Sequence, residues 1–116
     1  MHELGMVFHT IKTVNALAKE NNLTHIDKLV MEIGEVSGII NYYFEDCYFW
    51  AVRKEPLLMN STLEIETVKA ITTCNHCHKE YPTVQYGKTC PYCQSEDTVL
   101  KCGNEINIKQ IEVKED

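Results

Sequence analysis

The feature that most constrains this chain of 116 residues is a pair of Cys-x-x-Cys motifs in its second half. The stretch CNHCHKEYPTVQYGKTCPYC holds Cys74 and Cys77 in the first motif and Cys90 and Cys93 in the second, separated by twelve residues. Each two-residue gap lets one turn present both sulfurs, and four thiolates complete a tetrahedron around Zn(II). The spacing therefore predicts a structural zinc site made by these four cysteines.

The residues around the four cysteines make metal binding part of folding. Residues 71–102 are rich in cysteine, histidine, tyrosine, proline and glycine and hold few aliphatic side chains. Such a segment cannot build a conventional core that offsets its chain entropy, so we expect it to fold only with its metal. His76 and His78 flank Cys77. They are either solvated side chains or groups that let the site exchange ligands and respond to pH.

Three other interpretations of the cysteines are weaker. The residues from Cys74 to His78 also match C-x-x-C-H, the attachment pattern of c-type haem, but this leaves the second motif unexplained. A thioredoxin-like redox pair would lie at the start of a helix beside a parallel sheet, and this loop-rich segment offers neither. A disulfide framework is typical of exported chains, and no signal peptide is recognisable because Glu3 and Lys12 interrupt the first apolar stretch.

The chain is expected to be cytoplasmic and to have no membrane partner, because no stretch approaches the roughly 18 apolar residues of a membrane span. The 17 acidic residues exceed the 11 Lys and Arg residues, giving a formal charge of -6, which argues against nucleic acid as a partner. No Gly-rich phosphate loop, nucleophile elbow or H-E-x-x-H motif is present, and a zinc ion held by four cysteines lacks an open position. We therefore expect no enzyme activity.

Two helices are predicted from apolar spacing. The first runs from Leu4 to Ala18 and ends near residues 21–22, while the second is capped by Asn41 and ended by Pro56. Their expected buried positions are Leu4, Val7, Phe8, Ile11, Val14, Leu17 and Ala18 in the first, and Phe44, Cys47, Tyr48 and Ala51 in the second.

Three strands are predicted, over residues 26–33, 62–69 and 104–113. In the first, Leu29, Met31 and Ile33 face one side and Lys28, Val30 and Glu32 the other, and GEVSG closes it as a turn. The last strand is expected to contain a bulge, because its apolar residues change phase.

Pairing the last strand with the earlier two makes the cysteine segment an insertion between neighbours of one sheet. The expected fold class is mixed α/β: a small three-stranded mixed sheet with two helices, carrying an inserted zinc-ribbon-like domain. The predicted domains are 1–70 plus 103–116, and 71–102.

The opening tripeptide Met1-His2-Glu3 is a second candidate metal site. Because His2 is bulky, the initiator methionine should remain with a free amine. That amine, the His2 amide nitrogen and the His2 imidazole can form fused chelate rings around one cation, and Glu3 offers a further ligand. Such nitrogen-rich coordination is the preference of Cu(II) and Ni(II). A frayed polar terminus is the alternative, and the tripeptide alone does not decide.

Four features together resemble the HypA/HybF family of nickel metallochaperones. They are the tripeptide leading directly into an amphipathic helix, IGEVSG after the first strand, the doubled cysteine motif and the final strand. The resemblance covers essentially the whole chain. It implies a mixed α/β nickel domain with an inserted zinc domain, which agrees with the discontinuous organisation above.

The resemblance implies a function and a set of metal ligands. The chain would bind Ni(II) transiently and deliver it for maturation of [NiFe] hydrogenase, and in some organisms of urease. His2 would be the essential nickel ligand with the Met1 amine, Glu3 would support that site or a partner surface, and Cys74, Cys77, Cys90 and Cys93 would hold Zn(II). The alternative is a zinc-ribbon module that docks on protein or nucleic acid, with no role for nickel.

The resemblance also implies partners. The expected ones are a HypB-like GTPase and the hydrogenase large subunit or its maturation complex. An inserted module on short hinges is also compatible with a homodimer.

Overall fold

The computed structural model describes residues 2–114, with side chains from Glu3 onward, and its contacts divide the chain into two compact units. The first unit comprises Met1–Met31, Ile39–Glu66 and Asn107–Asp116. The second comprises Glu32–Gly38 and Thr67–Ile106. Each unit has buried side chains of its own. None of the helices within residues 2–114 is long and apolar enough to cross a membrane.

The first helix of the first unit, α1 (His2–Glu20), includes the predicted segment. Val7, Ile11, Val14 and Ala18 form the buried line that the spacing predicts. The prediction is wrong for two other positions, since Phe8 is 49% exposed and Leu17 is 37% exposed. Successive helical residues are about 100° apart, so both side chains lie on the flanks of the buried line, where the pattern alone cannot tell core from surface.

The second helix, α2 (Asn41–Ala51), continues into a 3-10 turn, η1 (Val52–Lys54), which ends two residues before Pro56. Phe44 and Tyr48 are fully buried on its inner face. The expectation that Asn41 caps this helix is wrong. The cap residue is Ile40, in an extended conformation, and it makes no side-chain cap bond. An apolar side chain cannot accept from the first helical amides, so the side chain of Ile40 satisfies none of them.

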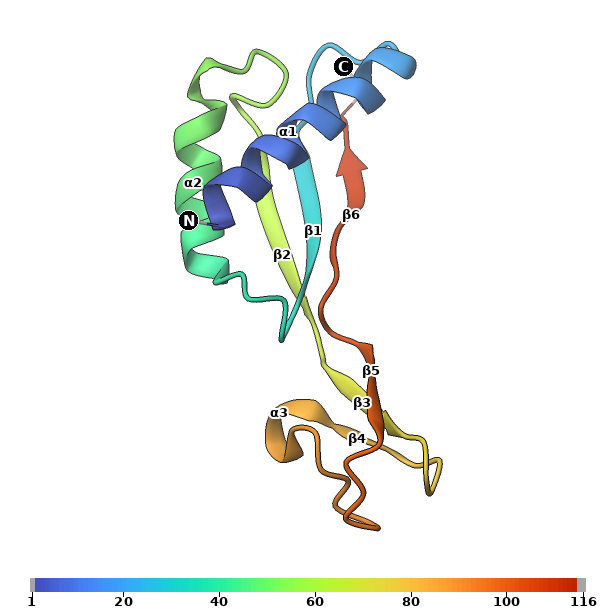
Figure 1. Cartoon of the computed structure of the whole chain (residues 1–116). Helices are drawn as coiled ribbons and strands as arrows, with labels where there is room; N and C mark the ends of the chain where they lie inside the picture. Colours follow the sequence, from blue (N-terminus) through green and yellow to red (C-terminus); the bar gives the residue numbers. More distant parts are fainter. Residues whose placement is uncertain (1, 115–116) are drawn as a thin grey trace. The chain divides into compact units, whose positions relative to one another are not determined.

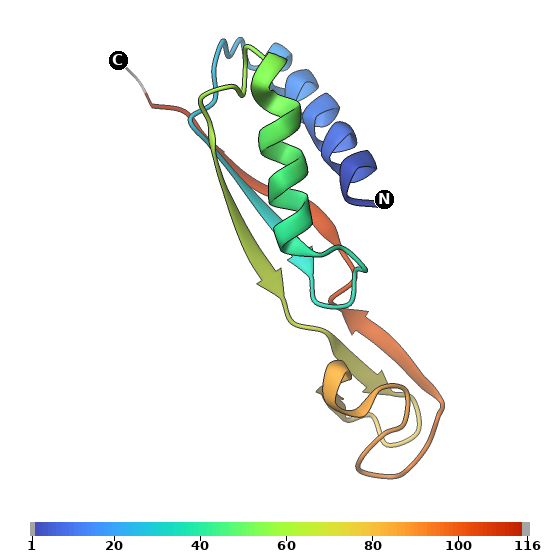
Figure 2. The same cartoon turned by 90° about the vertical axis from the view of Figure 1, so that its left-hand side faces the viewer.

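The sheet has the order β2-β1-β6, formed by β1 (Lys28–Gly34), β2 (Thr62–Val68) and β6 (Ile106–Glu112). In Figure 1, β1 and β2 run in the same direction and β6 runs in the opposite one. Parallel neighbours need a crossover, and α2 supplies it between β1 and β2. Figure 2 shows that α1 and α2 cover the same face of this sheet. The predicted three-stranded mixed sheet with two helices is confirmed.

Charged side chains join the three strands. The Nζ atom of Lys28 lies 3.0 Å from a carboxylate oxygen of Glu64 on β2 and 3.9 Å from one of Glu112 on β6. The hydrogen bond and charge of Glu64 raise the pKa of Lys28. Val30 lies on the same side of β1 and is only 2% exposed, so this central strand buries apolar residues on both of its sides. The bulge expected in β6 stays a prediction.

A buried hydrogen-bond chain closes one end of the first core. The hydroxyl of Ser61 donates to the carbonyl of Leu58 at 2.6 Å, so the Tyr48 hydroxyl donates to Ser61 Oγ, also at 2.6 Å. Replacing Tyr48 with phenylalanine is expected to lower the free energy of unfolding by about 1 kcal/mol, measured by urea denaturation. The matched control is Tyr42→Phe, because Tyr42 is 65% exposed, and it should change stability by less than about 0.5 kcal/mol. Equal effects of the two variants would contradict this account.

The second unit contains a sheet of order β4-β3-β5, formed by β3 (Ile71–Cys74), β4 (Glu80–Pro82) and β5 (Thr98–Cys102). All pairs are antiparallel, with Thr72 opposite Tyr81 on one side and opposite Leu100 on the other. A single short helix, α3 (Thr83–Tyr86), follows β4. These elements of three to five residues carry no readable period, so the sequence indicates the inserted module but not its strands.

The turn that follows β1 is bound by backbone hydrogen bonds to two other segments of the second unit. The amide of Gly34 donates to the carbonyl of Glu105 at 2.7 Å, and the amide of Val36 donates to the carbonyl of Gly103 at 2.8 Å. The amide of Glu35 donates to the carbonyl of Val68 at 2.8 Å. The segment GEVSG is therefore the predicted turn, and it is bound to the chain on both sides of the cysteine module.

Candidate metal centres

The four cysteines of the doubled motif meet in the second unit. All four Sγ atoms lie within 4.8 Å of one another, and two separations, Cys74 to Cys93 and Cys77 to Cys90, are 3.6 Å. Four sulfurs placed about 2.3 Å from one ion at tetrahedral angles are about 3.8 Å apart. All six cysteines of the chain have free thiols. The cluster therefore fits a tetrahedral zinc ion, and the disulfide interpretation is wrong.

The two motifs fold into matching knuckles. In the first, the amide of Cys74 donates to the carbonyl of Lys79 and the amide of His78 donates to the carbonyl of Cys74, both at 2.9 Å. In the second, the amides of Cys90 and Gln94 make the equivalent bonds at the same distance. Backbone amides also donate hydrogen bonds to sulfur. The amide of Cys77 donates to Cys74 Sγ, and the amide of Tyr92 donates to Cys90 Sγ. Repeated geometry of this kind presents two sulfurs from each turn.

Each knuckle contains a residue with left-handed backbone that sequence reasoning missed. His78 has a φ of 62° and Gln94 a φ of 70°. Each immediately follows the second cysteine of its motif, where the chain must turn back to form the bond to the first cysteine. The position directly after each motif could have indicated a left-handed turn. Neither residue there is a glycine, which is the residue that usually marks such a turn.

Gln94 provides a test of the knuckle backbone. A β-branched residue is strained at positive φ, so Gln94→Val should lower the midpoint of thermal unfolding and weaken metal retention, at a cost of about 1–2 kcal/mol. Gln94→Gly should leave stability within about 0.5 kcal/mol or raise it. Competition with a chelator measures retention in both variants. Equal loss in both would show that the side chain of Gln94, rather than its backbone, matters.

The thiols of the cluster have unequal proton affinities. The backbone amide of Cys77 lowers the pKa of the Cys74 thiol to about 6. The amide of Ser95 acts to lower that of Cys93, yet desolvation and the neighbouring thiols outweigh it and raise the pKa of Cys93 to about 12. One thiol therefore ionises easily while another retains its proton. A cation binding to all four must displace protons, which is the behaviour of thiolate metal sites.

The packing of the module depends on the cysteines themselves. Its buried cluster consists of Cys74, Tyr81 and Cys90, with Cys77 and Cys93 packed against it. Cys74 ends an antiparallel strand rather than beginning a helix beside a parallel sheet, so the thioredoxin-like interpretation is wrong.

The two histidines beside Cys77 lie outside the cluster. Both His76 and His78 are exposed, and within the described residues the candidate metal group contains only the four cysteines. Lys79 Nζ lies 4.8 Å above the ring of Tyr92 and so connects the first knuckle to the second. A role for the histidines in switching the site stays a prediction.

The predicted nickel site at the start of the chain lies largely outside the described residues. Nothing is described of Met1 or of the His2 side chain. Glu3, the third predicted ligand, accepts a hydrogen bond at Oε2 from the amide of Ile40, at 3.2 Å. Glu3 therefore connects the first turn of α1 to the start of α2. The side chains of Ile39 and Ile40 offer no oxygen or nitrogen ligand at that point.

The fold and the cysteine cluster define a small mixed α/β protein with an all-cysteine metal module. Residues 1–113 match the family model described as hydrogenase/urease nickel incorporation, metallochaperone, hypA. The chain belongs to the HypA family. The family comprises maturation factors for hydrogenase rather than catalytic enzymes.

Individual relatives agree along the whole length. The hydrogenase maturation factor HypA of Trichodesmium erythraeum is 34% identical over 99% of this chain and 97% of its own. The hydrogenase maturation factor HypA of Picosynechococcus is 32% identical, and the match covers 97% of this chain and 99% of its own. A solution structure of a HypA protein has a TM-score of 0.72 at 27% identity, covering 98% of this chain and 97% of its own. The Helicobacter pylori Ni metallochaperone HypA, with a TM-score of 0.73 at 23% identity and 95% coverage of both chains, shares the fold.

Proposed function

We propose that this chain binds Ni(II) at its N-terminal tripeptide and delivers the ion for maturation of [NiFe] hydrogenase. The observation that carries the proposal is the family match, which begins at residue 1 and so includes Met1, His2 and Glu3. The Met1 amine, the His2 amide nitrogen and the His2 imidazole supply the nitrogen donors that Ni(II) prefers. A chelate at a chain end releases its ion more readily than a closed cage, as delivery requires.

The contact of Glu3 supports this location. Its hydrogen bond to the Ile40 amide fixes the backbone next to His2 against the start of α2. The nickel ligands would then lie at the chain end, next to the point where α1 contacts the start of α2. Glu3 supports the site by this positioning, and its carboxylate is also the oxygen ligand nearest to His2 in the sequence.

The second metal of the proposal is a structural Zn(II) held by Cys74, Cys77, Cys90 and Cys93. The sulfur separations and the closed set of four cysteines support zinc. The proposed zinc domain is 71–102, carried by a nickel-binding domain of residues 1–70 plus 103–116. The zinc ion fixes the shape of the inserted module and takes no part in nickel chemistry.

The proposed partners are the proteins that a nickel delivery step requires. They are a HypB-like GTPase in the cytoplasm and the hydrogenase large subunit or its maturation complex, with urease as a further recipient. A homodimer is compatible with the inserted module. Family membership in hydrogenase maturation supports an interaction with that machinery.

Nickel transfer tests the delivery step. The chain is loaded with one equivalent of radioactive nickel and mixed with apo large subunit and a HypB-like GTPase, with a chelator present to trap released ion. We expect protein-bound nickel to appear on the large subunit with the unmodified chain and to fall to the level of free nickel with His2→Ala. Transfer that is equal for both chains would overturn the proposal.

A further inference from the structure

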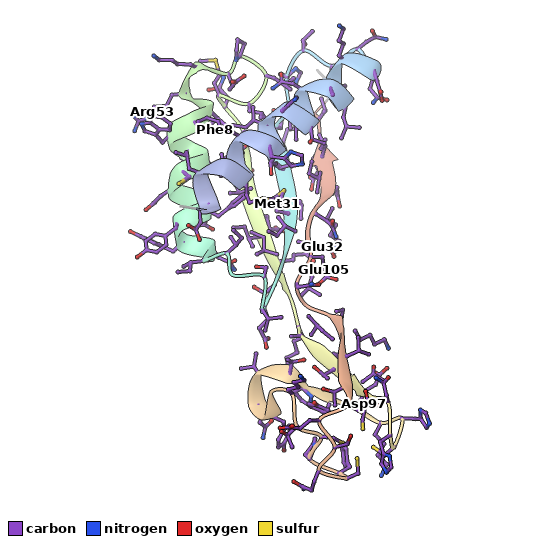
Figure 3. The ribbon with its side chains drawn as sticks, viewed as in Figure 1. Phe8, Met31, Glu32, Arg53, Asp97 and Glu105 are labelled. Atoms are coloured by element: carbon purple, nitrogen blue, oxygen red, sulfur yellow. The ribbon has the colours of Figure 1, made fainter. Side chains whose placement is uncertain are left out.

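A pocket with aromatic walls and a cationic rim lies between the two helices of the first unit. Its volume is about 330 Å³, and Phe8 from α1 meets Trp50 and Ala51 from α2 and Arg53 and Lys54 from η1 around it. Figure 3 labels Phe8 and Arg53, which extend from these neighbouring elements. The volume is at the lower end of the range for ligand pockets, so it accommodates one large side chain rather than a cofactor.

The aromatic walls are not required by the core of the unit. Phe44 and Tyr48 already fill the inner face of α2, whereas Trp50 is 57% exposed and Phe8 is 49% exposed. The rings of Phe8 and Trp50 pack edge to face with centroids 6.5 Å apart. Grouped, exposed aromatic residues mark interaction surfaces, and tryptophan and arginine are the side chains most often found at their energetic centres.

The cationic rim indicates the charge of the partner. Within the part of the chain that the structure describes, neither Arg53 nor Lys54 forms an ion pair, although acidic residues outnumber basic ones by 17 to 11 in the chain. Arg53 and Lys54 therefore present two adjacent positive charges at the rim of the pocket. Carboxylate groups of a bound segment would supply their missing counter-charges.

A second pocket sets the direction in which such a segment lies. It has a volume of about 260 Å³ and is lined by Leu4, Asp46, Cys47 and Trp50, so Trp50 is a wall of both pockets. Asp46 gives this pocket the opposite charge. Asp46 and Arg53 are seven residues apart, or about 10 Å along a helix. Carboxylates are therefore favoured at the Arg53 end and disfavoured at the Asp46 end.

We propose that this pair of pockets binds a short acidic segment of a partner protein, with an apolar side chain inserted beside Trp50 and carboxylates at Arg53 and Lys54. The segment spans both pockets, and its acidic end lies over η1. The proposal needs no nickel and stands apart from the delivery function, because none of these residues belongs to the proposed metal ligands.

The test uses the fluorescence of Trp50, the only tryptophan in the chain. Two blocked peptides are titrated into the zinc-loaded protein without nickel: Phe-Asp-Glu-Leu-Glu and its basic counterpart Phe-Lys-Arg-Leu-Lys. We expect the acidic peptide alone to produce a saturable shift of the Trp50 emission to shorter wavelength. The double variant Arg53→Glu with Lys54→Glu should lower its affinity at least about tenfold.

A matched control separates local from overall charge. Lys69→Glu with Lys88→Glu makes the same change in net charge at two exposed positions of the second unit, and it should change the affinity less than about twofold. Equal losses in both double variants, or equal responses to both peptides or to neither, would overturn the proposal. Emission that shifts with protein concentration alone would assign the pockets to a second copy of the chain. A shift only with phosphatidylglycerol vesicles would assign them to an anionic membrane surface.

Discussion

Replacing Cys90 with serine is expected to unfold the inserted module while the first unit stays folded. Cys90 is fully buried, and the buried cluster of the module consists of cysteines and one tyrosine, Tyr81. Removing one thiolate leaves an incomplete metal cage and places a hydroxyl in its position. Metal binding supplies most of the folding free energy of such small modules, of the order of 10 kcal/mol. Amide protection in β3, β4 and β5 should therefore fall by at least about a hundredfold.

Hydrogen exchange and metal analysis measure this effect together. The expected metal content falls from about one zinc per chain to a small fraction of that, and chelation of the unmodified protein should reproduce the loss of protection. Cys47→Ser and Cys102→Ser are matched controls, since both thiols lie outside the cluster. Each should retain its zinc. Full metal content and protection in Cys90→Ser would show that the cysteines do not form the site.

The second large effect is expected from Gly34→Ala, in the turn after β1. A Cβ atom at Gly34 would lie 2.1 Å from the carbonyl oxygen of Gly103 and 2.3 Å from its carbonyl carbon. These are backbone atoms, and Gly103 cannot retreat, because it is itself packed against Ala70 with a φ of +111°. The hydrogen bond from the Gly34 amide to Glu105 would break if the strand moved instead. We expect a loss of about 3 kcal/mol in the free energy of unfolding.

Gly5→Ala is the control for this substitution. Gly5 lies in α1, and a Cβ atom there would meet nothing within 4 Å. Alanine is the better helix former, so this variant should be stabilised by about 0.5–1 kcal/mol. Thermal unfolding followed by circular dichroism distinguishes the two, with a decrease of roughly 10 °C expected for Gly34→Ala. Similar midpoints for both variants would mean that the approach of the two backbones is looser than the structure indicates.

Periodicity predicted the large elements because burial sets their pattern. The line of Val7, Ile11, Val14 and Ala18 follows from one covered face, and in β1 the predicted apolar face is buried although Val30 on the other face is buried as well. The same spacing misplaced Phe8, because an aromatic residue on the flank of a helix fits either the core or a surface pocket. The pockets beside Trp50 were not predicted, because the apolar spacing of α2 shows which residues face the core and not what the others contact.

Contacts between segments that are distant in the chain could not be predicted from the sequence pattern. Nothing in the sequence indicates that Gly34 meets Gly103, since that approach depends on the path of the chain on both sides of the module. The cap of α2 is also not where the sequence predicts it, since the helix already begins at Asn41 and Ile40 is the cap residue. The cysteine cluster was predictable because the spacing within each motif determines its geometry locally.

Nickel titration of the zinc-loaded protein, by calorimetry and absorption spectroscopy, tests the central claim most directly. Three chains are compared: the unmodified protein, His2→Ala, and a variant with one extra residue before Met1, which removes the amine from chelate distance. We expect about one nickel ion per unmodified chain and no binding at this site in either variant. Equal binding by all three chains would contradict the N-terminal nickel site.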